Sequence, residues 1–119
     1  RIFIMNKESI FTRIIRGEIP GDFVYRGERL VALKDISPQA PVHFLIVPIE
    51  SSYRDVVELT KNDPELLSEI VQLAEQLAKE HADGQFRLIF NTGADAGQTI
   101  FHVHAHVLAG NLKEASLGE

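Results

Sequence analysis

Three of the five histidines in this 119-residue chain fall at alternate positions of one short run, as His102, His104 and His106. Because side chains alternate between the two faces of a strand, an extended segment over 102–108 would place the three imidazoles on one face. Clustered rings repel each other when charged, so at least one is expected to be neutral. A neutral imidazole can act as a nucleophile, a base or a metal ligand. The run is therefore the first candidate site in the chain.

A zinc site is one chemistry open to these residues, because neutral imidazoles two positions apart on a strand can share one ion. The outer rings of the run stand roughly 13 Å apart along an extended strand, however, and do not converge easily. A further ligand would have to come from His43, His81 or Asp35. His81 lies near the end of an expected helix, where the helix dipole explains it, and it receives no catalytic role. The spacing therefore favours a site without a metal or another cofactor.

Covalent catalysis at phosphorus is the second chemistry. A neutral ring nitrogen can attack phosphorus, and water can then hydrolyse the adduct, which divides one difficult displacement into two easier ones. Neighbouring imidazoles can stabilise phosphate oxygens or give a proton to the leaving group. The preceding loop, residues 91–99, contains two glycines with Asn, Asp and Thr. Such a loop can direct several N–H groups at an anion, although taken alone it is also typical of an ordinary turn.

Two helices are expected to hold this site, one short and one long. Ser9 is a candidate N-cap for a short amphipathic helix over residues 10–16. Asp63 and Pro64 are typical of a helix start, and the long helix is expected over 63–82. Its apolar stripe is wide enough to face both a sheet and a second copy of the chain.

Short apolar runs separated by turn residues predict the strands. Residues 35–41 contain two prolines and are expected to form a stiff loop. Residues 50–61 are polar and mixed, and only one helical turn is expected there, near Tyr53–Val57. The expected strands are 23–25, 30–33, 43–48, 86–90 and 102–108.

The composition bounds the class of protein. The chain is 45% hydrophobic and 24% charged, which fits a single domain over 1–119. Its net charge of −5, without a lysine- or arginine-dense run, argues against a nucleic acid polymer as partner. The absence of cysteine fits a reducing compartment, so a cytoplasmic location is expected, and no apolar run approaches the roughly 20 residues that span a membrane. Residues 1–4 are interpreted as a remnant before a native start at Met5, and 111–119 as a C-terminal tail.

Several segments together resemble a known family. His102–Leu108 resembles the histidine triad (HIT) signature, His-φ-His-φ-His-φ-φ, and Gly97-Gln98-Thr99 precedes it at the family's spacing. Further segments are characteristic of the HINT branch, the histidine triad nucleotide-binding proteins. These segments are residues 10–20, 35–41 and 43–48.

The resemblance implies an α+β, HIT-like fold with a five-stranded antiparallel sheet and one long and one short helix, assembled as a homodimer. It also implies a purine nucleoside phosphoramidase, which hydrolyses the P–N bond of nucleoside 5′-phosphoramidates through a covalent nucleotidyl-histidine intermediate. The ligand would be a purine nucleotide. A dinucleoside polyphosphate hydrolase or nucleotidyl transferase of the same family, and a non-catalytic nucleotide-binding protein, remain alternatives.

Roles follow from the motif positions. His104 is similar to the nucleophile, His106 to the histidine that contacts phosphate and leaving group, and His102 to the one that orients the nucleophile. His43 is similar to a further supporting histidine, and Thr99 would supply a catalytic hydroxyl. The implied substrate positions are Asn91, Gly97, Gln98 and Thr99 for phosphate, Asp35 and Ile36 for ribose, and Ile10, Phe11, Ile14, Ile19, Leu33 and Leu45 for the base.

Some of these residues also have simpler interpretations. Phe11 and Ile14 could belong to the core, Asp35 could cap a turn, and His43 could be a buried, hydrogen-bonded residue. The chain also departs from the family pattern. Leu33 stands where some relatives carry an aromatic residue, and the tail lacks the tryptophan and proline that shape leaving-group specificity in several branch members.

Overall fold

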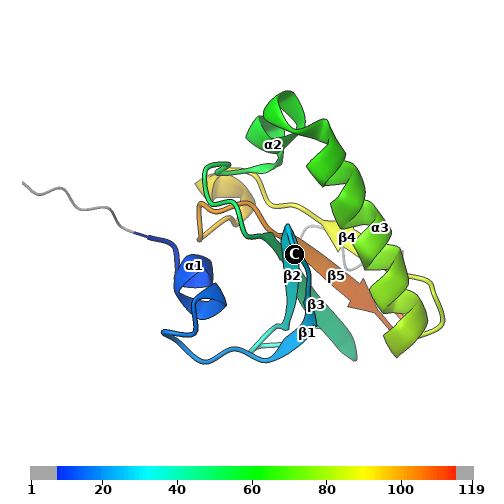
Figure 1. Ribbon diagram of the computed structural model, residues 1–119. Coiled ribbons are helices and arrows are strands. Elements are labelled where there is room, and N and C mark those ends of the chain that lie inside the picture. The colour runs from blue at the N-terminus through cyan, green and yellow to red at the C-terminus, as the bar shows by residue number, and fades with distance from the viewer. Residues whose placement is uncertain (1–7, 115–119) are drawn as a thin grey trace, which may run out of the picture.

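The computed structural model describes residues 8–114. It contains one antiparallel sheet of five strands in the order β1-β2-β3-β5-β4 (Figure 1). The α+β class and the five-stranded antiparallel sheet are therefore confirmed. Met5, residues 1–4 and the end of the tail lie outside the described residues. The elements are α1 (Ile10–Ile15), β1 (Phe23–Arg26), β2 (Leu30–Lys34), β3 (Val42–Pro48), α2 (Val56–Asn62), α3 (Pro64–His81), β4 (Arg87–Ile89), a 3-10 turn (Ala94–Ala96) and β5 (Ala105–Ala109).

The central strands are buried on both faces of the sheet. Ala32 and Ile46 pack in the larger apolar cluster, together with α3. Their chain neighbours Val31 and Val47 point the other way, into a second cluster with Phe11 of α1. Figure 1 shows α1 apart from α2 and α3, across the sheet. The fold thus has two unequal layers of helix, and the smaller one is α1.

The long helix begins and ends where the sequence predicts. The Asp63 side chain accepts a hydrogen bond from the N–H of Leu66, and Pro64 occupies the first helical turn, where a missing N–H costs nothing. Most of its apolar stripe is buried against the sheet, whereas Val71 is 44% exposed. None of the helices within residues 8–114 is both long enough and apolar enough to cross a membrane.

Helix α2 was not expected beyond a single turn. Asp55 caps it by accepting a hydrogen bond from the N–H of Glu58 at 2.9 Å. Leu59 is its one fully buried side chain, so the segment carries almost no apolar periodicity. The Asp55 cap is therefore the sequence signal for this helix, because the hydrophobic pattern does not reveal it.

The histidine strand is shorter than predicted. The strand expected over 102–108 begins only at Ala105 and continues to Ala109. Before it, the N–H of Val103 donates to the carbonyl of Tyr53 at 2.9 Å, outside the strand ladder. His102 and His104 therefore precede β5, and only His106 lies on it.

Candidate active site

A cavity of about 320 Å³ lies on the α1 side of the sheet. Most of the predicted substrate residues line it, from α1, the ends of β2 and β3, the loop after β4 and the histidine run. They are Ile10, Phe11, Ile14, Leu33, Asp35, Ile36, Leu45, Asn91, Gly97, Thr99, His104 and His106.

Two predicted substrate residues do not line this cavity. Ile19 lies half-buried in the turn after α1. Gln98 is 3% exposed, and its carboxamide contacts only backbone. It accepts from the N–H of Gly93 at 2.9 Å and donates to the carbonyls of Arg54 and Ile100. Its side chain thus holds the loop in shape, and the phosphate contact expected at this position stays a prediction.

The three imidazoles share one side, as predicted: His102 and His104 both contact Phe11 of α1, and His106 lines the cavity, whereas Val103, Ala105 and Val107 lie in the cluster with α3. They differ in burial. His102 is 1% exposed and does not line the cavity. Its Nε2–H donates to the carbonyl of Pro48 at 2.7 Å, and its Nδ1 lies 2.6 Å from the hydroxyl oxygen of Ser9. These two buried partners hold the ring beside the start of α1 and outside the cavity, so the cavity receives only His104 and His106 from the triad.

His104 presents a lone pair to the cavity. Its Nδ1 lies 2.9 Å from the carbonyl oxygen of His102. A carbonyl can only accept, so Nδ1 carries the proton of the neutral ring. The other nitrogen, Nε2, is then unprotonated, which is the form needed for nucleophilic attack.

His106 presents a proton instead. The backbone N–H of Gln39 donates to Nδ1 of His43 at 3.0 Å, so the neutral His43 ring carries its proton on Nε2. That nitrogen lies 2.9 Å from Nδ1 of His106 and donates to it. Neutral His106 therefore carries its own proton on Nε2, where it can act as a donor toward a ligand.

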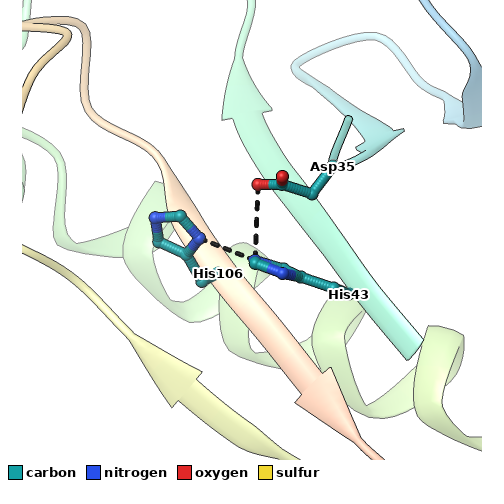
Figure 2. A group of neighbouring side chains, drawn as sticks. All are labelled: Asp35, His43 and His106. Atoms are coloured by element: carbon teal, nitrogen blue, oxygen red, sulfur yellow. Dashed lines mark hydrogen bonds and ion pairs between the residues drawn. The ribbon is translucent and has the colours of Figure 1, made fainter. Parts of the chain in front are cut away.

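The pairing of β3 with β5 brings the last two rings together. Leu45 lies opposite His106 in the register, so His43, two residues earlier on the same face, is its diagonal neighbour. Figure 2 shows one ring nitrogen of His43 directed at both the Asp35 carboxylate and the His106 ring. The carboxylate oxygen is 3.4 Å from Nε2 of His43.

Asp35, His43 and His106 are also the one group among residues 8–114 whose spacing could suit a metal ion, with ligand atoms within 4.8 Å of one another. The protonation pattern argues against that use. Nε2 of His43 carries a proton and has no lone pair to offer while Gln39 donates to Nδ1. The group is therefore better suited to holding and passing a proton.

Burial keeps the site histidines neutral. It lowers the pKa of His104, and it lowers the pKa of His102, where the positive form of His104 acts in the same direction. Burial, followed by repulsion from His104 and His43, lowers the pKa of His106 to about 4. The neutral forms described above for His102, His104 and His106 are thus the ones populated at pH 7.

Both apolar and polar side chains line the cavity. Phe11 forms one wall, with its ring centroid 4.9 Å from that of His104. Asn91 and Thr99 lie among the polar groups, near the histidines. No motif pointed to several further lining residues, which come from turns and strand ends. They are Pro20, Gly21, Asp22, Lys34 and Ile100.

Sequence reasoning missed two supporting groups. Ser9 was expected only as a helix cap, and nothing in the local sequence indicates its contact with His102. The N–H of Gln39 fixes the proton of His43 but belongs to the backbone, so residue type carries no signal for it. Both groups act on histidines that lie behind the cavity wall.

Comparisons with known proteins identify the family of the chain. The family model described as "Scavenger mRNA decapping enzyme C-term binding" matches residues 8–119. The purine nucleoside phosphoramidase of Escherichia coli K12 is 39% identical over 108 residues, which cover 89% of this chain and 90% of that protein. An uncharacterized HIT-like protein of Synechocystis is 42% identical over 107 residues, covering 89% and 93%.

Solved structures show the same fold. A HIT family hydrolase from Clostridium thermocellum is 40% identical, with a TM-score of 0.81 over 89% of this chain and 93% of that one. A histidine triad protein from Clostridium difficile is 35% identical, with a TM-score of 0.82 over 92% and 96%. The chain belongs to the histidine triad family.

Proposed function

We propose that this protein is a purine nucleoside phosphoramidase, with His104 as the nucleophile. The observation that carries the proposal is the hydrogen bond from Nδ1 of His104 to the His102 carbonyl, which leaves Nε2 unprotonated. The name of the 39% identical Escherichia coli relative, and the hydrolase named among the solved structures, support the same reaction class.

The apolar and polar side chains of the cavity suit the base and the sugar-phosphate parts of a nucleotide. Apolar side chains such as Phe11 and Leu45 suit a flat purine ring, because burial of both surfaces is favourable. The carboxylate of Asp35 can accept hydrogen bonds from ribose hydroxyls. The Thr99 hydroxyl and the nearby loop N–H groups suit phosphate oxygens.

In the first step, Nε2 of His104 attacks the α-phosphorus. A bond between Nε2 and phosphorus forms as the bond between phosphorus and the amine nitrogen breaks. The amine leaves with a proton from Nε2 of His106, which must be in its imidazolium form at that moment so that a neutral ring remains. The negative charge of the bound phosphate favours that form. The adduct is a good leaving group in its turn, since its ring nitrogen departs as neutral imidazole.

In the second step, water attacks the same phosphorus and releases His104. The hydroxyl of the water stays on phosphorus, giving the nucleoside monophosphate. Its other proton returns to Nε2 of His106, now acting as a base. Over both steps, one water is consumed and one amine is released.

The test compares the wild type with His104→Ala on adenosine and guanosine 5′-phosphoramidates. We expect turnover by the wild type, no measurable turnover by the variant, and retained binding of AMP. Mass spectrometry of acid-quenched wild-type protein should detect the nucleotidyl adduct on the peptide that contains His104. Equal turnover by His104→Ala would contradict the proposal.

The same protein separates the two alternatives. A dinucleoside polyphosphate substrate should load His104 much more slowly than a phosphoramidate, and the reverse order would favour the hydrolase or transferase. A non-catalytic nucleotide-binding protein would bind AMP but form no adduct with any of these substrates.

We also propose that the protein is a homodimer. Strand β4 lies at one edge of the sheet and is only half-buried along its length. On α3, Val71 remains 44% exposed. A second copy could cover both, which light scattering of the purified protein tests, and Val71→Glu should then favour the monomer.

A further inference from the structure

Ser9 connects helix α1 to the histidine run. Its hydroxyl oxygen accepts a hydrogen bond from the backbone N–H of Thr12 at 3.1 Å, which caps the helix. The same oxygen lies 2.6 Å from Nδ1 of His102, although 93 positions separate the two residues. One small side chain therefore touches both the short helix and the buried end of the triad.

The direction of each bond follows from the partners. The Pro48 carbonyl can only accept, so the proton of neutral His102 is on Nε2. Nδ1 then holds a lone pair, and it can only receive the proton of the Ser9 hydroxyl. The hydroxyl thus donates to His102 with its proton and accepts from Thr12 with a lone pair.

Ser9 affects the cavity in two ways, through His102 and through helix α1. The His102 carbonyl accepts from Nδ1 of His104, so the placement of residue 102 sets the direction of the nucleophile. Phe11, on the helix that Ser9 caps, forms a cavity wall, and its ring centroid lies 5.8 Å from that of His102 and 4.9 Å from that of His104.

We propose that Ser9 is a positioning residue for the reaction: its hydroxyl clamps His102 from one side while Pro48 holds the other, and so aligns His104. The inference rests on the proposed function. It goes beyond the helix cap, because a cap needs only an oxygen that accepts, whereas the clamp needs an O–H that donates.

Three substitutions separate the cap from the clamp. Ser9→Thr keeps both the accepting oxygen and the donating proton. Ser9→Asp keeps a strong cap but offers His102 only an acceptor. Ser9→Ala removes both. Asp63→Ala serves as the matched control, since it removes a cap of the same kind from α3, away from this cavity.

The expected results differ for kcat and KM. Ser9→Thr should behave like the wild type. Ser9→Asp should lower kcat about tenfold or more through misalignment of His104, while KM stays close to the wild-type value because α1 remains capped. Ser9→Ala should lower kcat and raise KM. Asp63→Ala should lower the thermal midpoint without changing kcat.

A spectroscopic signal tests the clamp without using turnover. The ¹⁵N chemical shift of Nδ1 in His102 should report an unprotonated nitrogen in the wild type and in Ser9→Thr. In Ser9→Asp the carboxylate should draw a proton onto Nδ1, so His102 should become protonated at a higher pH than in the wild type. The other charges that act on this ring are those of His104 and Glu50, which all variants retain.

Either of two results would overturn the inference. One is a kcat for Ser9→Asp equal to that of Ser9→Thr, which would leave Ser9 with a capping role only. The other is a protonated Nδ1 in wild-type His102. If the wild type hydrolyses no phosphoramidate, the proposed function fails, and the His102 signal and the affinity for AMP still decide whether Ser9 holds the ring.

Discussion

Two pairs of histidines, each with one member lining the cavity and one behind it, are arranged in opposite senses. In one pair, the cavity residue His104 donates through Nδ1 to the backbone carbonyl of His102. In the other, the cavity residue His106 accepts at Nδ1 from His43, whose own Nδ1 receives the N–H of Gln39. The backbone partner is a carbonyl in the first pair and an amide in the second.

That difference decides which chemistry each ring can perform. A carbonyl partner forces the proton onto Nδ1 and leaves a nucleophilic Nε2 on His104. An amide partner, acting through His43, forces the proton of His106 onto Nε2 and makes it a donor. Two side chains of the same type, in one cavity, therefore acquire complementary roles from the backbone behind them.

The largest expected effect comes from substituting His106. The effect should depend on the leaving group of the substrate. His106→Asn removes the proton donor but not the nucleophile, so turnover of an alkylamine phosphoramidate should fall about 10²- to 10⁴-fold. With an aniline leaving group, which departs with less help from an acid, the loss should be much smaller. Steady-state rates for the two substrates measure this ratio.

His104→Asn is the matched control, because it removes the nucleophile and should abolish turnover of both substrates alike. If the loss in His106→Asn were the same for alkylamine and aniline substrates, His106 would not be the proton donor. The comparison between the two pairs would then be wrong.

The sequence predicted much of this site, for a physical reason. Glycine, proline and capping residues act locally, and apolar periodicity reports burial, so α3 and the strands could be placed to within a few residues. The motif positions also predicted His104, Asp35 and Phe11 as site residues, and all three line the same cavity.

The burial of His102 could not be predicted in this way. Strand alternation placed the three imidazoles on one side, but it could not show that Ser9 and Pro48 bind the two nitrogens of His102 there. Those partners lie 93 and 54 positions away along the chain. Hydrogen bonds of such range depend on the finished fold, and alternation describes only the local chain.

The next prediction concerns how the His106 ring affects the stability of the fold at different pH values. The pKa of His106 is lowered from 6.5 to about 4, so the unfolded chain takes up this proton first as the pH falls. The contribution to the free energy of unfolding is therefore complete above about pH 6.5 and declines until about pH 4. At about 1.4 kcal/mol for each unit of pKa, the loss is about 3 kcal/mol at most.

Urea unfolding at pH 7, 5.5 and 4.5 measures this decline. His102 and His104 contribute in the same direction, so the test is the difference between the wild type and His106→Asn. The variant should show the shallower decline. Parallel curves for the two proteins would contradict the lowered pKa of His106.

A smaller effect should follow from changing the backbone partner itself. Gln39→Pro removes the N–H that donates to His43, so His43 can hold its proton on either nitrogen. The proton donor on His106 is then no longer fixed, and turnover of an alkylamine substrate should fall about tenfold. Gln39→Ala retains the N–H and should match the wild type.

Zinc inhibition gives this variant a second readout. Once Nε2 of His43 can carry a lone pair, it joins the Asp35 carboxylate and Nδ1 of His106 as a set of possible zinc ligands. Added Zn²⁺ should therefore inhibit Gln39→Pro at concentrations that leave Gln39→Ala active. Equal inhibition of the two variants would show that the Gln39 N–H does not control the proton of His43.

The smallest effect lies outside both histidine pairs. Ile36 lines the cavity but is fully exposed, at 102% of its reference area, so Ile36→Ala should change the free energy of unfolding by less than about 0.5 kcal/mol. A bound nucleotide that covers about 40 Å² of this side chain would gain about 1 kcal/mol, so KM should rise about fivefold. Ile49, 38% exposed on another part of the surface, provides the control substitution Ile49→Ala, which should leave KM unchanged.

Because neither change touches the backbone carbonyl or amide behind the rings, the ratio of alkylamine to aniline turnover should stay at the wild-type value in both. A shift of that ratio in Ile36→Ala would mean that the proton positions also depend on the cavity rim, and not only on the two backbone partners.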